Sequence, residues 1–152
     1  MIEYHILSFL EDQGALQRGS DGFVTFLPDK DSVSVGIYAE PGVQRTDTHH
    51  FDSDVIGIQF RFQGKSRSQV NAKALQVHRT ITALGSVELS GADGEGNALD
   101  PIFINDTHIV NAPAFVENDE KNRLILSSHY MVHVNLGGNL LRKMTLTETI
   151  NA

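Results

Sequence analysis

The sequence predicts an α+β fold, with a mostly antiparallel β-sheet, an N-terminal helix and one long central helix packed on the sheet. Two neighbouring stretches carry this prediction. Residues 55–63 alternate apolar and polar side chains, which is typical of a strand with one buried face. The stretch after it changes to helical spacing. Its apolar residues recur at steps of three and four and form one stripe: Val70, Ala74, Val77, Ile81 and Leu84.

The boundaries of this strand-helix unit are also visible in the sequence. The expected buried face of the strand is formed by Ile56, Ile58, Phe60 and Phe62. Ser66, followed by Gln69 three residues later, has the form of a capping box at the start of the helix. Gly85 stands where we expect the helix to end.

The residues before this unit predict three elements and a loop. Ile2, Ile6, Phe9 and Leu10 indicate a short amphipathic helix that ends near Gly14. Residues 13–31 are rich in turn residues, although the run FVTFL is compatible with a short extended piece. Residues 32–39 alternate and predict a strand. The polar segment 42–54 predicts a long loop, and long loops between paired strands are often functional.

After the helix the sequence is mainly extended. We expect a brief strand at Val87–Leu89, a turn-rich connector, and two extended pieces, Pro101–Val110 and Pro113–Val116. A polar reversal at 118–122 precedes what we expect to be the longest strand, which ends near Leu136. Its expected apolar face is formed by Leu124, Leu126, Tyr130, Val132, Val134 and Leu136.

Residues 1–136 are therefore predicted to form one domain, and residues 137–152 an extended arm or edge strand. Gly137 and Gly138 break the preceding strand. Beyond them, apolar side chains alternate with threonines in the run MTLTETI. The apolar members of that run are Met144, Leu146 and Ile150.

Composition excludes several classes of protein. The 152 residues fit one domain, and the lack of cysteine excludes disulfides and thiolate chemistry. No apolar run approaches the ~20 residues of a membrane span, and residues 1–10 lack the basic start of a signal peptide. We therefore expect no membrane partner and synthesis in the cytoplasm. A net charge of −7 argues against tight binding to a nucleic-acid backbone.

Charge is segregated along the chain. Residues 65–84 carry only basic charges, and residues 88–120 carry only acidic ones. One interpretation is two solvated faces of a monomer. The other is a pair of complementary surfaces on neighbouring copies, as a head-to-tail ring requires. On this second interpretation the candidates for the contact between subunits are Arg67, Lys73, Arg79, Asp93 and Glu95.

Catalytic and metal-binding motifs are incomplete. Gly64-Lys65-Ser66 resembles the end of a phosphate-binding loop, but Gln59 stands where that loop needs a glycine. The run Asp93–Asn97 begins like a calcium loop, but Ala98 and Ile104 occupy its required glycine and glutamate positions. We therefore expect no catalytic residues and no cofactor.

The histidines suggest a metal site only weakly. His129 and His133 fall on a predicted strand, where a spacing of four residues separates side chains by roughly 13 Å, too far to share an ion. His49 and His50 lie beside Asp52, without fixed ligand geometry. We expect no metal, and a small metal-binding, ligand-binding or hydrolytic domain that uses these three residues stays as an alternative.

Four stretches resemble one family of viral proteins. They are LEDQGALQRGSDGFVTFLP, VSVGIYAEPG, VIGIQFRFQGKSRSQVNAKALQVHRTITAL and APAFVENDEKNRLILSSHYMVHV. Their order is similar to the helix, first strand, strand-helix unit and final hairpin of the tail terminator proteins of long-tailed phages. These are also labelled minor capsid or tail-to-head joining proteins. The resemblance extends to about Leu136.

The resemblance implies a homo-oligomeric ring, a hexamer in that family, at the junction of tail and head in the virion. Such a ring caps the tail tube and meets the head-connector protein, and DNA passes through it without specific binding. No catalytic residue carries over. A head-completion protein of the same neck is the alternative.

One or both of two segments, Thr46–Asp54 and Leu140–Ile150, are expected to be mobile in the free protein and to become ordered against the tail tube protein or the connector. Hydrogen exchange that is equal in the free and bound states would contradict this. The contact candidates in them are Thr46, Asp47, His49, His50, Asp52, Leu140, Leu141 and Met144.

Overall fold

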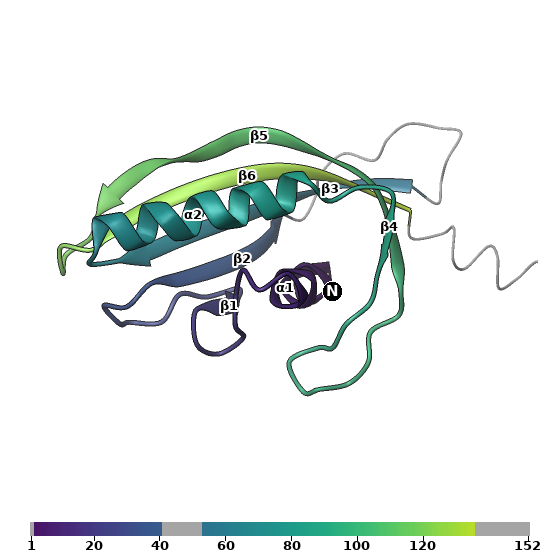
Figure 1. The fold of residues 1–152 in the computed structure, drawn as a ribbon, viewed down its shortest axis with the longest axis horizontal. Helices are drawn as coiled ribbons and strands as arrows, with labels where there is room; N and C mark the ends of the chain where they lie inside the picture. The colour runs from purple at the N-terminus through teal and green to yellow at the C-terminus, as the bar shows by residue number, and fades with distance from the viewer. Residues whose placement is uncertain (1, 41–52, 136–152) are drawn as a thin grey trace, which may run out of the picture.

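The computed structural model describes residues 2–40 and 53–135, which form two helices and one six-stranded sheet (Figure 1). The elements in chain order are α1 (Ile2–Asp12), β1 (Gly22–Val24), β2 (Ser34–Glu40), β3 (Ser53–Gly64), α2 (Arg67–Thr82), β4 (Val87–Leu89), β5 (Ile102–Asn118) and β6 (Leu124–Asn135).

The strands lie in the order β1-β2-β3-β6-β5-β4. Every neighbouring pair is antiparallel except β1 and β2, which run parallel. The centre of the sheet is the long pairing of β3 with β6, from Ser53 opposite Asn135 to Gly64 opposite Leu124. The predicted α+β class, with a mostly antiparallel sheet and two helices, is confirmed.

Both helices lie on the same side of the sheet. Helix α2 packs along β3, β6 and β5, and α1 packs against β1 and β2 and also contacts α2. In Figure 1 the curved sheet arches over α2, and α1 lies beneath β2. The core between these layers is formed by fully buried side chains, of which Tyr130, Phe60 and Phe62 are the largest. The rings of Phe60 and Tyr130 meet edge to face with centroids 5.7 Å apart.

The strand-helix unit agrees with its prediction in most respects. Ile58, Phe60 and Phe62 are fully buried, whereas Ile56 is only half-buried because it lies nearer the end of β3. All five residues of the predicted helical stripe are buried. The Ser66 hydroxyl accepts a hydrogen bond from the Gln69 amide at 3.4 Å and caps α2. The helix ends at Thr82, before the predicted stop at Gly85.

Strand β5 corrects two predictions. It is one continuous strand and not two pieces, and it is longer than β6, which was expected to be the longest. Its pairing with β6 shifts register at four places, two of them on either side of Asn111. These bulges accommodate Pro113, which cannot donate a ladder hydrogen bond, without ending the strand.

The remaining elements are close to their predicted positions. Helix α1 ends at Asp12, and Gly14 follows with φ +74°, a conformation that favours glycine. Strand β1 begins one residue before the run FVTFL, and β2 and β4 match their predicted stretches. The alternation of β6 is confirmed from Leu126 to Val134, whereas at its start Leu124 and Leu126 are buried as expected but Ile125 between them is buried as well. The arm 137–152 and most of the polar loop lie outside the described residues.

Candidate assembly surface

The outer edge of β5 is only partly paired. Strand β4 covers its first residues, with Leu89 opposite Ile102 and Val87 opposite Ile104. The cover continues for a short distance, because the Ser86 amide donates to the Asn105 carbonyl at 3.0 Å and the Thr107 hydroxyl donates to the Leu84 carbonyl at 2.9 Å. Past Thr107, no strand among the described residues pairs with this side of β5. We call residues 108–118 the open edge.

The open edge carries apolar side chains on both faces of the strand. Ile109 and Val110 are 53% and 52% exposed, and Phe115 and Val116 are 58% and 47% exposed. Ile109 stands opposite Tyr130 and Phe115 opposite Leu126, so both belong to the helix side of the sheet, whereas Val110 and Val116 lie at the register shifts, and Val116 does not line the groove on that side. An exposed, apolar, unpaired strand edge is a site at which another chain can add. The open edge is therefore the main candidate for contact with another protein.

Sequence reasoning did not identify this surface. The signal that could have found it is the loss of alternation in the run IVNAPAFV, in which apolar residues stand side by side. A strand that is apolar on both faces is either buried between layers or covered by a partner. In the described structure neither face of this part of β5 is covered.

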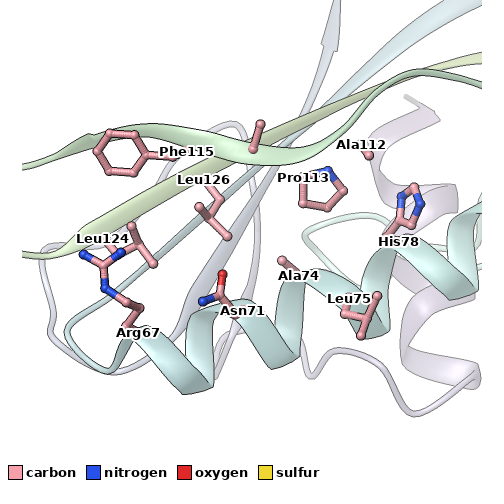
Figure 2. Close-up of a pocket in the computed structure, with 11 residues that line it drawn as sticks. Arg67, Asn71, Ala74, Leu75, His78, Ala112, Pro113, Phe115, Leu124 and Leu126 are labelled. Atoms are coloured by element: carbon pink, nitrogen blue, oxygen red, sulfur yellow. The ribbon is translucent and has the colours of Figure 1, made fainter.

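Beside the open edge, a groove of about 570 Å³ runs between α2 and β5 (Figure 2). Leu124 and Leu126 of β6 and Ala74 of α2 form its apolar floor. Pro113 and Phe115 of β5 form one wall. The other wall belongs to α2. Its lining residues include Arg67, Asn71, Leu75 and His78, and Leu75 is 46% exposed.

One polar contact links α2 to β6 beside this groove. His78 Nδ1 lies 2.6 Å from the Tyr130 hydroxyl, and the two rings pack with centroids 5.7 Å apart. Burial raises the pKa of Tyr130 above its ordinary value, so the phenol keeps its proton. This contact joins the C-terminal half of α2 to β6 and adds to the packing of the helix's buried apolar stripe.

The three basic interface candidates on α2 differ in their surroundings. Lys73 is engaged within the chain, because its Nζ donates to the Ala15 carbonyl at 2.8 Å and lies 3.1 Å from Asp21 Oδ2. Arg67 and Arg79 are exposed and form no ion pair with the described residues. Among these three, only the two arginines are free to meet an acidic partner.

The two acidic candidates also differ. The Asp93 carboxylate accepts hydrogen bonds from the amides of Asn97 at 2.9 Å and Glu95 at 2.8 Å, and these bonds lower its pKa. Its carbonyl accepts a 2.7 Å bond from Arg18. Asp93 therefore stabilises its own turn. Glu95 is exposed and forms no ion pair with the described residues, so it remains a candidate.

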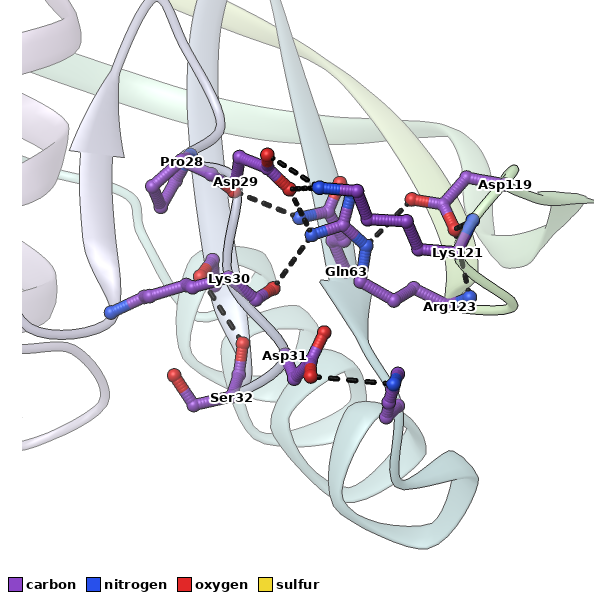
Figure 3. A network of polar contacts seen from close by, with 11 residues as sticks. Pro28, Asp29, Lys30, Asp31, Ser32, Gln63, Asp119, Lys121 and Arg123 are labelled. Atoms are coloured by element: carbon purple, nitrogen blue, oxygen red, sulfur yellow. Dashed lines mark hydrogen bonds and ion pairs between the residues drawn. The ribbon is translucent and has the colours of Figure 1, made fainter.

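A polar network at the turn between β5 and β6 has no local signal in the sequence (Figure 3). The Arg123 guanidinium donates from Nε to Asp119 at 2.7 Å and from Nη1 to Asp29 at 2.9 Å. Lys121 Nζ also lies 2.6 Å from Asp29. The bond from Lys121 lowers the pKa of Asp29, and the Arg123 amide lowers that of Asp119. The network holds the end of the open edge against the loop before β2.

The histidines of β6 lie on the sheet face opposite the helices. Since Tyr130, Val132 and Val134 fill the buried face, His129 and His133 point the other way, as their predicted place on a strand requires. His129 Nε2 lies 2.8 Å from the Glu40 carboxylate. His133 Nδ1 lies 3.9 Å from Asp106. The described residues contain no group of three or more histidine and carboxylate side chains placed to hold a metal ion.

The predicted contacts with tail tube or connector are not placed by the structure. Thr46, Asp47, His49, His50, Asp52, Leu140, Leu141 and Met144 all lie outside the described residues. The same holds for the alternative metal or ligand site, which depends on three of them.

No protein-family model matches the sequence, and a search of curated proteins finds no match either. Within the described part of the chain, neither helix has the length and hydrophobicity needed to cross a membrane.

Proposed function

We propose that this chain is a structural assembly protein that forms a closed ring, and that it acts as a phage tail terminator without catalytic activity. The observation that carries the proposal is the open edge of β5. Its four exposed large apolar residues and its unpaired backbone stand next to an apolar groove. A sheet edge of this kind is a template on which another chain can pair, and such pairing would also remove its apolar side chains from water.

Charge supports a contact between copies of the chain. The net charge of −7 disfavours a nucleic-acid partner, while Arg67 and Arg79 offer basic groups that have no partner among the described residues. Glu95 offers an exposed acid on the connector between β4 and β5. Two different surfaces that fit one another produce head-to-tail assembly, which closes into a ring when the rotation allows.

The particular role comes from the resemblance of four stretches of sequence to tail terminators. On this proposal the ring stops growth of the tail tube, presents a surface to the head connector and lets DNA pass. It is made in the host cytoplasm and resides at the tail-head junction of the virion. The acidic balance of the chain suits a lumen that does not hold phosphates.

Native mass spectrometry of the full chain tests the assembly part of the proposal. We expect one closed oligomer, a hexamer, with no larger species as concentration rises. A monomer throughout the micromolar range would overturn the proposal.

A second assay tests the role. Purified ring is added to polymerising tail tube protein, and tube lengths are measured by electron microscopy. A tail terminator shortens the tubes and is seen at one end of each. A ring that leaves tube length unchanged and binds the head connector would instead identify a head-completion protein.

A further inference from the structure

We infer that the groove between α2 and β5 of one copy receives residues 143–150 of a neighbouring copy, which add along the open edge. This inference rests on the proposed function, and it names the contact that would join one subunit to the next. It brings together two features that are unrelated in the sequence. One is the open edge of β5 with its groove, along which a strand can pair. The other is the segment 143–150, whose sequence is typical of a strand.

The apolar lining of the groove and the neighbouring strand edge favour a particular kind of segment. Its floor and one wall are apolar, so an occupant must place apolar side chains on the face toward Leu124, Leu126 and Phe115. The face of the occupant that points away from the groove remains in water and must be polar. Because the open edge of β5 borders the groove, an extended occupant can also pair with the unpaired backbone of that edge.

Residues 143–150 have this pattern. Met144, Leu146, Glu148 and Ile150 fall on one face of an extended chain, and Thr145, Thr147 and Thr149 fall on the other. Threonine also has high strand propensity. The three apolar side chains fit the groove, and the threonine face suits solvent. Glu148 shares the first face, and Arg67, which lines the groove, is a basic group without an ion pair among the described residues.

The place where the described chain ends favours a neighbour's groove. At Asn135 the chain leaves the sheet beside Ser53 and Phe103, whereas the groove floor lies at the other end of β6, at Leu124 and Leu126. With twelve residues, β6 is roughly 40 Å long, and residues 136–152 span at most about 60 Å when fully extended. Reaching its own groove would require the segment to turn back and run nearly extended along β6. A neighbouring copy requires no such reversal.

The open edge itself disfavours the simplest alternative, in which two copies of β5 pair symmetrically. Pro113 has no amide hydrogen, and the register shifts around it bend the strand, so a long β5–β5 ladder would be interrupted. A short segment that also buries side chains in the groove tolerates the interruption. Since the segment and the groove are different surfaces, a head-to-tail contact between them is compatible with a ring.

Paired variants of the full chain test the inference by native mass spectrometry and sedimentation. The groove variant Phe115→Asp has Val116→Asp as its control, because the two side chains are similarly exposed but Val116 does not line the groove. The segment variant Met144→Asp/Leu146→Asp has Thr145→Asp/Thr147→Asp as its control. We expect both test variants to associate about tenfold or more weakly, since a carboxylate loses water in an apolar groove, and both controls to assemble as wild type.

Complementation is the decisive measurement. The groove variant keeps an intact segment and the segment variant keeps an intact groove, so an equimolar mixture should form a heterodimer that neither variant forms alone. The absence of that heterodimer, or wild-type assembly by the segment variant, would overturn the inference. Wild-type assembly by the segment variant would leave the proposed function standing. If the two variants complement each other but the wild-type protein does not cap tail tubes, the inference is retained and the role of tail terminator is rejected.

Discussion

Two arginines connect segments that secondary structure does not join. Arg18 donates from Nη1 to the carbonyls of Ala92 and Asp93 at 3.1 and 2.7 Å, and from Nη2 to the Ser8 hydroxyl at 3.1 Å. It therefore ties α1 to the connector that follows β4. Arg123 does the same for the turn between β5 and β6 through its bonds to Asp29 and Asp119. A guanidinium suits this task because its planar fork serves several acceptors at once.

The Arg123 network predicts a dependence of stability on pH. Lys121 and Arg123 lower the pKa of Asp29, and the Arg123 amide, followed by its side chain, lowers the pKa of Asp119, in both cases below the ordinary value of 3.8. A carboxylate with a lowered pKa in the folded state stabilises the fold above its ordinary pKa. That stabilisation is lost as pH falls through the lowered folded value.

We therefore expect the free energy of unfolding, measured with urea, to fall between pH 5 and pH 2. The variant Asp119→Asn should be less stable than wild type at pH 6 and should lose less stability on acidification. Asp31→Asn is a suitable control, because Asp31 meets Lys65 in an exposed pair that contributes little. Equal pH profiles for wild type and Asp119→Asn would contradict the prediction.

The exposed side chains of Arg67 and Arg79 lead to a prediction about assembly. The variant Arg67→Glu/Arg79→Glu should weaken oligomers, with a dissociation constant raised about tenfold or more, if these groups meet acids such as Glu95 on a neighbour. Light scattering across a dilution series measures the effect. Its salt dependence provides a further check, because exposed charges are screened.

The control for this experiment is Lys65→Glu, compared with the single variants Arg67→Glu and Arg79→Glu, since each changes the net charge by the same amount. Lys65 already pairs within the chain with Asp31 and is exposed, so we expect a small effect on stability and none on assembly. An unchanged oligomer mass for the double arginine variant would remove Arg67 and Arg79 from the contact.

Among the elements, α2 forms one wall of the groove, and the contact between His78 and Tyr130 helps to hold α2 against β6. Tyr130→Phe removes only the hydroxyl and should lower the free energy of unfolding by about 1 kcal/mol. Tyr38→Phe is the matched control, since the Tyr38 hydroxyl forms no hydrogen bond with the described residues. Urea unfolding of the three proteins measures the difference, and equal losses for both variants would contradict the assignment.

The elements also show why the sequence predicts some of the fold and not the rest. Strands β3 and β6 and helix α2 pack against one continuous core, so each has a single period that is readable from neighbouring residues. Strand β5 lacks that period past Thr107, because neither of its faces is covered there. Asn111 and Pro113 therefore indicated a break between two strands, while bulges allow one strand to continue.

The candidate site was predicted less well than the fold, for a physical reason. Charge patterning identified Lys73 and Asp93, but their partners Asp21 and Arg18 lie in segments distant in sequence, and no local pattern reveals such pairs. Whether this edge of β5 is open depends on the order of the strands in the sheet. That order cannot be read from the sequence of β5 alone. The exposed arginines are the part of the predicted contact that the structure leaves available.

At the scale of the whole molecule, helices cover one side of the sheet and the border at β5 stays open. Hydrogen exchange should show this asymmetry. We expect outward amides of residues 108–118 to exchange quickly in a dilute, monomeric sample and to slow by at least about tenfold on assembly, when they gain partners.

The amides of β6 provide the internal reference, because β3 and β5 pair with them on both sides. They should be protected equally in monomer and oligomer. Protection of the open edge that does not change with concentration would place the contact between subunits elsewhere.

The pairing of β3 with β6 also has a consequence for the order of folding. These strands form the centre of the sheet, yet α2, β4 and β5 lie between them in the chain. Non-local pairing of this kind is slow, because a long loop must close before its contacts are gained. During synthesis, β3 and α2 leave the ribosome well before β6, so the edge of β3 that pairs with β6 has no partner until then. The nascent chain therefore depends on α2, a local and fast-forming element, to shield Phe60 and Phe62 until the last strand arrives.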